Sequence, residues 1–338
     1  MSKLPPGKVS PKLLEKDVFP FLGADDSDVL HGPGIGRDAA LVRVGRQVIV
    51  ATTDPITGVI QNIGSYVVHI CANDVATFGI RPRWFLATIL LPESVESQLL
   101  KQIMISMHSA AKELEISIIG GHTEVTAGLN RPIIIGFMLG IAEENKYVTS
   151  SQARPDNSII LTKGVALEGT AILATEREKF LRSKLPDSLV NHAQQYIHRI
   201  NVVPEALKAM STGAVTAMHD PTEGGVANGL HELANASGLG FIIDRSKLVI
   251  HEETDQICQL FEINPLNLIA SGAMLMAVES DRASTVLQLL EDEGIPAAII
   301  GRLLKDSSQR TIIEEDGTVK PLQQPETDAL WEALTKSK

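Results

Sequence analysis

The sequence contains little cysteine, few aromatic residues and no long apolar run. Its 338 residues include two cysteines, Cys71 and Cys258, which exclude a disulfide framework or a cysteine-rich metal site and predict a reducing, cytoplasmic location. Aromatic residues make up only 4%, beside 26 glycines, a composition typical of α/β enzymes rather than β-sandwiches. The longest apolar run, Ile133–Ala142, is too short to span a bilayer, and the first residues lack the apolar segment of a signal peptide. We therefore expect no membrane segment.

Basic residues are outnumbered by acidic ones. Lys and Arg total 30 against 41 Asp and Glu, which gives a net charge of −11. Such a surface repels nucleic acid and anionic lipid, so neither is expected as a partner. A nucleotide ligand would need a metal ion or a local lysine to offset this charge.

The length of the chain favours two domains of ordinary size. We predict an N-terminal arm (1–30), an α/β domain (31–142), a second α/β domain (155–305) and a polar tail (306–338). The boundary is the polar, turn-rich segment that precedes the apolar strand at Ser158–Thr162.

Within the first domain, apolar periodicity predicts four strands and two helices. The strands are expected at 40–44, 48–53, 83–91 and 133–141, and the helices at 64–78 and 94–114. Their order contains two β-α-β crossovers, as in a sheet layered by helices on one side. In the second domain we predict strands near 158–162, 241–243, 273–278 and 297–300, a helix-rich stretch at 176–210, and helices at 222–237 and 282–293.

Closely spaced glycines precede the first of these strands, in the run Gly32-Pro33-Gly34-Ile35-Gly36-Arg37-Asp38. The main chain at Gly34 and Gly36 can approach a phosphate closely. Because the run precedes a strand, it matches neither a Rossmann fingerprint nor a Walker loop. An ordinary turn is the alternative.

Polar residues interrupt apolar elements at two further places. Asp54 ends a strand, and Pro55 keeps it out of the helical conformation. Asn73 and Asp74 lie inside an apolar helix, where their burial requires compensation by a ligand or by a tertiary hydrogen bond. With Asp38 they make a set of hard oxygen donors, which Mg²⁺ prefers when it bridges nucleotide phosphates.

A histidine follows the glycine pair Gly120-Gly121, at a predicted junction between a strand and a turn. His122 can ligate a metal or transfer protons, although a loop histidine often does neither.

The run His219-Asp220-Pro221-Thr222-Glu223-Gly224-Gly225-Val226 opens a predicted helix. Asp220 suits an N-cap, and Glu223 suits the positive end of the helix dipole. Gly224 and Gly225 suit neither role, since each costs about 1 kcal/mol relative to alanine inside a helix. Close approach of a phosphate to the helix N-terminus explains them better. Further along, His231 is either a buried histidine with a satisfied hydrogen bond or an acid–base group.

Six motifs occur in a recognisable order: Asp38-Ala39-Ala40, Thr52-Thr53-Asp54, Ala72-Asn73-Asp74-Val75, Gly120–Thr123, the run from His219 to Val226 with His231-Glu232, and Leu266-Asn267 before Gly272. Together they resemble the signature of the PurM-like (AIR synthase-related) superfamily. Arg81-Pro82-Arg83-Trp84 and the glycine-rich helix start make the chain most similar to HypE proteins of hydrogenase maturation.

This resemblance implies a PurM-like two-domain α/β fold. The N-terminal domain would pair with that of a second subunit to close a β-barrel, giving a homodimer, and hydrogenase maturation proteins would be further partners. The implied cofactors are ATP and Mg²⁺. The implied residues are Asp38, Asp54 and Asp74 for the metal; Gly34, Gly36, Asp38, Asp54, Asn73, Asp220, Gly224 and Gly225 for the cofactor; and Asp74, His122 and His231 for catalysis. In HypE, ATP activates a carbamoyl group on a C-terminal cysteine and drives its dehydration to a thiocyanate.

Three positions depart from the HypE pattern. The chain has no cysteine after Cys258 to carry a carbamoyl group, His122 replaces the usual Asp, and Ser271 replaces a frequent Glu. We therefore expect an ATP- and Mg²⁺-dependent HypE-like enzyme whose acceptor is open. The alternatives are a catalytically degenerate ATP-binding or partner-binding dimer, and a small-molecule phosphotransferase of the thiamine-phosphate kinase type.

Overall fold

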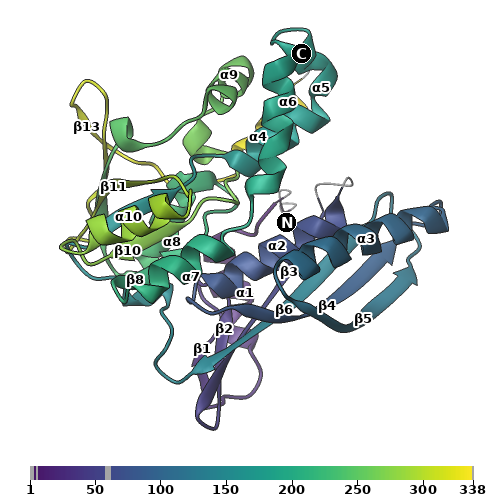
Figure 1. Cartoon of the computed structure of the whole chain (residues 1–338), viewed down its shortest axis with the longest axis horizontal. Coiled ribbons are helices and arrows are strands. Elements are labelled where there is room, and N and C mark those ends of the chain that lie inside the picture. The colour runs from purple at the N-terminus through teal and green to yellow at the C-terminus, as the bar shows by residue number, and fades with distance from the viewer. Residues whose placement is uncertain (1–3, 5–6, 58–61, 337–338) are drawn as a thin grey trace. The chain divides into compact units, whose positions relative to one another are not determined.

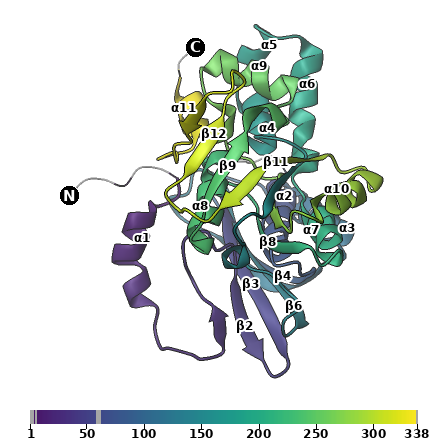
Figure 2. The ribbon, with the colours of Figure 1, turned by 90° about the vertical axis from the view of Figure 1, so that its left-hand side faces the viewer.

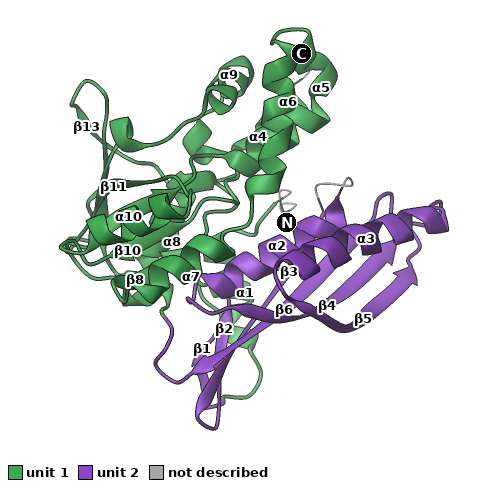
Figure 3. Cartoon of the chain, viewed as in Figure 1, with its two compact units in different colours: residues 1–25, 33–37, 148–338 green, residues 26–32, 38–147 purple. Residues whose placement is uncertain are grey.

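The computed structural model describes residues 4, 7–57 and 62–336. It divides into two compact units, which Figure 3 colours separately. Unit 1 consists of residues 1–25, 33–37 and 148–338, and unit 2 of residues 26–32 and 38–147. Both mix helices and strands, which confirms the predicted α/β class. The predicted arm and tail each include residues outside the described ranges. Within those ranges, no helix has the length and apolar character needed to cross a membrane.

Unit 2 is a six-stranded sheet with two helices on one face (Figure 1). In sheet order the strands are β1 (Val29–His31), β2 (Ala40–Val44), β3 (Gln47–Ile56), β6 (Ile133–Glu143), β4 (Pro82–Leu91) and β5 (Ser117–Val125), and the helices are α2 (Ile63–Ala76) and α3 (Ser97–Glu113). Strands β4 and β5 pair in parallel, and every other pair in this sheet is antiparallel. The chain therefore makes the two predicted crossovers, β3-α2-β4 and β4-α3-β5.

Strand β6 is apolar on both of its faces. Alternate residues such as Ile134 and Met138 are fully buried on the side of the helices. The residues between them on the opposite face, including Ile135, Phe137 and Ile141, are also apolar but partly or largely exposed. An antiparallel strand with one face in water normally alternates apolar and polar residues. Strand β6 departs from this alternation.

Helix α2 lies unusually close to its neighbours because glycine occupies the contact points. A Cβ atom added at Gly64 would lie 2.2 Å from the main-chain oxygen of Ile103 in α3. One added at Gly136 of β6 would lie 2.6 Å from the Cys71 sulfur of α2. These contacts fix the helix against both the sheet and the second helix.

Substitution Gly64→Ala is expected to destabilise unit 2 by up to about 2 kcal/mol. Overpacking against main chain costs about 1–3 kcal/mol and outweighs the gain of about 1 kcal/mol in helix propensity. Urea denaturation followed by circular dichroism measures the difference. Gly120→Ala is the control, since its Cβ would meet only the Leu86 side chain, at 3.6 Å. Equal stability of the two variants would contradict this account of the α2–α3 contact.

Unit 1 is built around a seven-stranded sheet. In sheet order its strands are β13 (Val319–Pro321), β12 (Arg310–Ile313), β9 (Gly240–Asp244), β11 (Ala297–Leu304), β7 (Ser158–Thr162), β10 (Leu275–Val278) and β8 (Val215–His219). Its helices are α1 (Pro11–Asp17), α4 (Leu167–Glu176), α5 (Glu178–Arg182), α6 (Asp187–Gln195), α7 (Val203–Ser211), α8 (Gly225–Ser237), α9 (Glu252–Phe261), α10 (Ala283–Asp292) and α11 (Ala329–Thr335). Helices α4, α6 and α9 pack on one another at one end of the unit (Figure 2).

The register of three strands sets where the loops of unit 1 meet. Leu275 of β10 pairs with Leu161 of β7 on one side and with His219 of β8 on the other. Because β10 is antiparallel to both neighbours, β7 and β8 end at the edge where β10 begins. The loops after β7 and β8 and the loop before β10 therefore lie at one edge of the sheet.

Candidate functional site

In unit 2, a buried hydrogen bond joins two of the predicted motifs. The hydroxyl of Thr52 on β3 donates to Asp74 Oδ2 at 2.6 Å, and it also lies 3.1 Å from the main-chain oxygen of Asp38. The hydrogen bond from Thr52 therefore compensates the burial of the Asp74 carboxylate. The main-chain oxygen of Asp38 lies near the same Thr52 hydroxyl. Asn73, the neighbour of Asp74 on α2, is completely buried.

Asp54 lies near Asp74, because the charges of both carboxylates act on the thiol of Cys71 on α2. Burial raises the pKa of Cys71 well above its usual value, and the charges of Asp54 and Asp74 raise it further. Both carboxylates thus act on one thiol, so the three aspartates come from one region of unit 2.

His122 lies in a strand, not in the predicted turn, so that expectation was wrong. Strand β5 continues to Val125, and His122 pairs with Thr88 of β4. The glycine before it serves this pairing, since a Cβ at Gly121 would lie 2.1 Å from the Ala87 main-chain oxygen. The imidazole is largely exposed, and its Nε2 lies 3.0 Å from Glu124 Oε2. Its proposed role in catalysis stays a prediction.

The glycine run before β2 forms a turn in unit 1. Gly36 has a φ of +72°, and a Cβ there would lie 2.5 Å from the main-chain oxygen of Glu232 in α8. Its own main-chain oxygen accepts a hydrogen bond of 2.6 Å from the Ser150 hydroxyl. At Gly34 an added Cβ would meet only the flexible Arg37 side chain. Packing on α8 thus explains Gly36, and contact with a phosphate stays a prediction for both glycines.

Helix α8 begins at Gly225, later than the predicted start at Thr222, so Asp220 is not its N-cap. Gly224 and Gly225 have φ of +80° and +64°, and they turn the chain through the left-handed region before the helix. A Cβ at Gly225 would lie 2.5 Å from the main-chain oxygens of both Leu266 and Leu268. The glycines therefore let α8 approach the loop that leads to β10.

Two positions at the end of β8 are buried beside α8. His219 Nε2 lies 3.0 Å from Glu232 Oε2, and Lys8 Nζ of the N-terminal arm lies 3.5 Å from Glu232 Oε1. Burial alone would raise the pKa of Glu232, but His219 and Lys8 hold it at about 2. The next residue, Asp220, is only 1% exposed.

His231 is a buried histidine whose ring nitrogens both have partners, and its role in catalysis stays a prediction. Its Nε2 lies 2.8 Å from the main-chain oxygen of Leu322, and its Nδ1 lies 3.1 Å from an Arg310 nitrogen. Burial lowers its pKa. Because both ring nitrogens already have partners within unit 1, the imidazole holds α8 against the segment around β12.

A further carboxylate lies at the shared edge of the unit 1 sheet. Glu168, in the first turn of α4, is 6% exposed. Burial raises the pKa of Glu168 to about 7. Hydrogen bonds from the hydroxyl and the main-chain N–H of Ser271 act in the opposite direction and lower this pKa. Its Oε2 atom has no hydrogen-bond partner within the part of the chain that the structure describes.

Two acidic neighbours act on the Glu168 carboxyl. The charges of Asp328 and Glu223 both raise its pKa. Asp328 is itself buried, which raises its pKa to about 6, and it accepts a 2.6 Å hydrogen bond from the Gly224 N–H. Glu223 accepts a 2.8 Å hydrogen bond from the main-chain N–H of Lys8. The N-terminal arm and the starts of α4, α8 and α11 therefore meet here.

Glu168, Asp328 and Lys8 are not among the residues predicted from the sequence. A signal for Glu168 existed, because Lys163-Gly164 follows a predicted strand and a glycine stands beside the glutamate. Asp328 and Lys8 lie far from the other residues in the chain, and only tertiary structure brings them to this edge.

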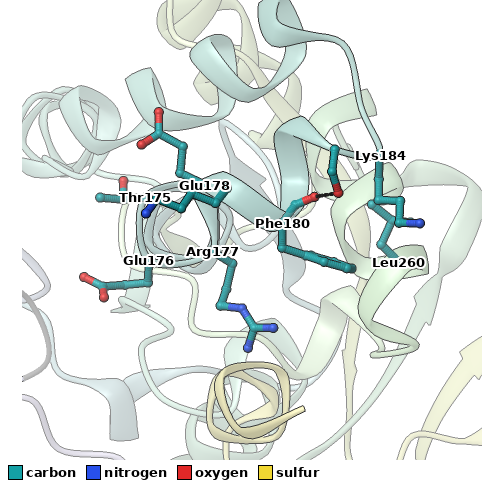
Figure 4. Close-up of a pocket in the computed structure, with 9 residues that line it drawn as sticks. Thr175, Glu176, Arg177, Glu178, Phe180, Lys184 and Leu260 are labelled. Carbon is teal, nitrogen blue, oxygen red and sulfur yellow. Dashed lines mark hydrogen bonds between the residues drawn. The ribbon is translucent and has the colours of Figure 1, made fainter. Parts of the chain in front are cut away.

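A separate hollow of about 1070 Å³ lies on unit 1 along α5, and no predicted site residue lines it (Figure 4). Arg177, one of the three cationic residues that line it, donates to the main-chain oxygens of Ala333, Leu334 and Lys336 at the end of α11. This guanidinium caps a helix, so the hollow offers mainly the surface of α5.

Two family models match the chain in the order of its sequence. The N-terminal domain of AIR synthase related proteins matches residues 36–142, and the C-terminal domain matches residues 154–314. Together they cover more than half of the chain. The protein therefore belongs to the AIR synthase-related, PurM-like family.

Within this family the chain is HypE-like. It is 31% identical over 309 residues to a hydrogenase expression/formation protein of Methanocaldococcus jannaschii, with 89% of each chain covered. It is 29% identical to the carbamoyl dehydratase HypE of Rhizobium leguminosarum bv. viciae, covering 85% of this chain and 82% of that protein. The crystal structure of HypE in complex with ATP matches its fold with a TM-score of 0.73 at 21% identity, covering 96% of this chain and 97% of that one.

The substitution Glu168→Gln is expected to stabilise the protein at pH 8 but not at pH 4. The folded-state pKa of about 7 lies above the ordinary glutamate value of 4.5, so the wild type loses stability as pH rises between these values. The difference between variant and wild type should grow by about 3 kcal/mol over that range.

Urea denaturation at both pH values tests this, with Trp331 fluorescence in a Trp84→Phe background reporting on unit 1. Glu176→Gln, an exposed residue of the same helix, is the control and should show no such pH dependence. A pH-independent difference for Glu168→Gln would show that this carboxyl has an ordinary pKa.

Proposed function

We propose that the protein is an ATP- and Mg²⁺-dependent enzyme of the HypE type. It would activate an acceptor by transfer of the γ-phosphoryl group and, with a carbamoyl acceptor, drive its dehydration. The similarity to carbamoyl dehydratases and to the fold of a HypE that binds ATP supports this. The observation that carries the proposal is the buried Asp74 carboxylate, held by Thr52 beside Asp38.

The donor set of unit 2 suits Mg²⁺. Asp38, Asp54 and Asp74 supply hard carboxylate oxygens from one region, and Asn73 adds an amide beside Asp74. In the proposal these residues hold the metal, whose charge would offset that of the phosphates in a protein with a net charge of −11. The Thr52 hydroxyl fixes the orientation of Asp74.

Unit 1 contributes main-chain groups in this proposal. The start of α8 is the positive end of the helix dipole, which favours anions, and the Gly224 N–H there already donates to the Asp328 carboxylate. Gly224 and Gly225 keep this start free of side chains, and Gly34 and Gly36 do the same in the adjacent turn. We assign these glycines and Asp220 to the nucleotide.

Neither cysteine of this chain suits the role of acceptor. Burial raises the pKa of Cys258 to about 12 and that of Cys71 well above its usual value. A thiol of this kind is not nucleophilic at neutral pH. We therefore propose that another molecule, such as a hydrogenase maturation partner, presents the acceptor.

The sheet of unit 2 supports a homodimer. In the described part of unit 2, α2 and α3 lie on one face of the sheet (Figure 3). The other face carries the exposed apolar row of β6. The edge strand β5 is also almost entirely exposed. A second copy that covers this face would bury both the apolar row of β6 and the exposed edge strand β5. We propose that two copies pair there, as the family resemblance implies.

Substitution Asp74→Asn is expected to lower the rate of ADP formation from Mg·ATP by about 100-fold or more, because it removes charge from the phosphate site. Asparagine retains an oxygen for Thr52, so the fold should persist, which circular dichroism checks. Glu113→Gln, an exposed acid of unit 2, is the control and should keep the parental rate. A parental rate in Asp74→Asn, or no nucleotide turnover in the parent, would favour the degenerate binding dimer.

Substitution Phe137→Asp is expected to convert the dimer to monomers, because it puts a charge into the apolar row of β6. Sedimentation velocity measures the mass. Phe137 is 38% exposed, and Ile105→Asp on α3, where the side chain is 55% exposed, is the matched control that should stay dimeric. A monomeric parent would exclude this interface.

A further inference from the structure

Glu168 is the most unusual polar group of unit 1. It is buried, Ser271 alone donates the hydrogen bonds that lower its pKa, and Oε2 has no partner in the described part of the chain. A buried carboxylate without full hydrogen bonding costs stability, so the fold holds it in place against a penalty. Groups of this kind are concentrated at functional sites.

The strand register places Glu168 at the edge already assigned to the nucleotide. It follows β7, whereas the Gly224-Gly225 turn follows β8 and Ser271 precedes β10, and these three ends coincide. Main-chain bonds tie the segments together, since the Gly169 N–H donates to Ile269 at 3.0 Å and the Ala270 N–H donates to Thr222 at 3.3 Å. Glu168 thus lies next to the start of α8.

The loop before Glu168 is strained and firmly held. Lys163, Gly164 and Ala166 all have positive φ, of +59°, +136° and +56°. The buried Lys163 ammonium fixes this loop, because it lies 2.7 Å from Glu205 and donates to two main-chain oxygens. Strain that is retained in this way often serves to aim a functional side chain.

We propose that Glu168 accepts the proton that the acceptor loses when it attacks the γ-phosphorus of ATP. The O–H or N–H bond of the acceptor breaks and its proton passes to Glu168 Oε2. The acceptor oxygen, which is the hydroxyl oxygen itself or the carbonyl oxygen of an amide that loses its N–H proton, bonds to phosphorus, and the bond from phosphorus to the bridging oxygen breaks to release ADP. This role rests on the proposed function, and it makes Glu168 a catalytic base.

The electrostatics of the edge suit this role. A carboxyl that titrates near neutral pH can both accept and return a proton under cellular conditions. Glu168 has a pKa of about 7 because of its burial and the charges of Asp328 and Glu223. The opposing hydrogen bonds from Ser271 keep it from rising further.

The same acidic neighbours select the acceptor. Glu223 and Asp328 disfavour a second phosphate or carboxylate close to Glu168. We therefore assign the acceptor to neutral or cationic groups that carry an N–H or O–H, such as an amide. Access to the buried carboxyl requires a covering segment to move, and the arm at Gly7-Lys8 lies against Glu223.

The test measures ADP release from Mg·ATP between pH 5.5 and 9, with S-ethyl thiocarbamate as a neutral N–H probe and thiamine monophosphate as an anionic one. For the wild type with thiocarbamate, kcat/KM should rise tenfold per pH unit below about pH 7 and then level off. Glu168→Gln should lower kcat/KM by roughly 100-fold or more and abolish this pH dependence, while ATP affinity by calorimetry stays unchanged.

Two further variants separate catalysis from structure. Ser271→Ala should shift the rise of kcat/KM with pH to higher pH, because Ser271 lowers the pKa of Glu168. Glu176 is exposed on α4, the helix that carries Glu168, and Glu176→Gln should leave both the rate and its pH dependence unchanged.

Three outcomes would contradict parts of the proposal. A wild-type rate with wild-type pH dependence in Glu168→Gln would overturn the role of Glu168 and leave the proposed function intact. Failure of the wild type to bind ATP or to release ADP would overturn both. Stronger stimulation by thiamine monophosphate than by thiocarbamate would overturn the acceptor class and favour a phosphorylated acceptor.

Discussion

The antiparallel pairing of β10 with both β7 and β8 is the constraint on which unit 1 depends. One register, with Leu275 between Leu161 and His219, puts the ends of two strands and the start of a third at one edge. Glu168, the Gly224-Gly225 turn and Ser271 come together because of that placement. A slip of one residue would turn the alternating side chains of β10 to the other face and move the loop before it. Since β7, β8 and β10 are almost completely buried, their apolar side chains hold the register firmly.

Glycine then decides how closely the loops can approach this edge. Gly36 faces the main chain of α8, and Gly225 faces two main-chain oxygens of the loop before β10. Both have positive φ, so a side chain would be strained there even with room. Unit 2 uses the same device at Gly64 and Gly136. At Gly64 the neighbour is the main chain of α3, whereas at Gly136 it is the side chain of Cys71 on α2.

The sequence predicted the larger elements because each is set by local pattern. Periodicity located β4, β6, α2 and α3 and indicated the crossovers, and the ordered motifs indicated the family. Periodicity failed where residues distant in sequence determine the element's ends. Pairing with β4 extends strand β5 through His122. Close contacts with Leu266 and Leu268 accompany the later start of α8. Asn73 and Asp74 were recognisable as polar interruptions of an apolar helix. For Glu168 the neighbouring glycines were the one signal in the sequence, since its burial and its contact with Ser271 arise only in the folded protein. Ser271, where the resemblance leads one to expect a glutamate, donates to a carboxylate that α4 supplies instead.

Two glutamates of unit 1 show why the remaining chemistry cannot be read from residue type. Glu168 and Glu232 are equally buried, at 6% exposure each, yet their pKa values are about 7 and about 2. Burial acts on both in the same direction, so their partners make the difference. Glu232 faces His219 and Lys8, which favour its charge, whereas Glu168 faces Asp328 and Glu223, which oppose it. A carboxylate that stays ionised suits electrostatic positioning, and one that titrates near neutrality suits proton transfer. The fold thus separates two identical side chains into two roles, and it does so by bringing an N-terminal lysine to one and a C-terminal aspartate to the other.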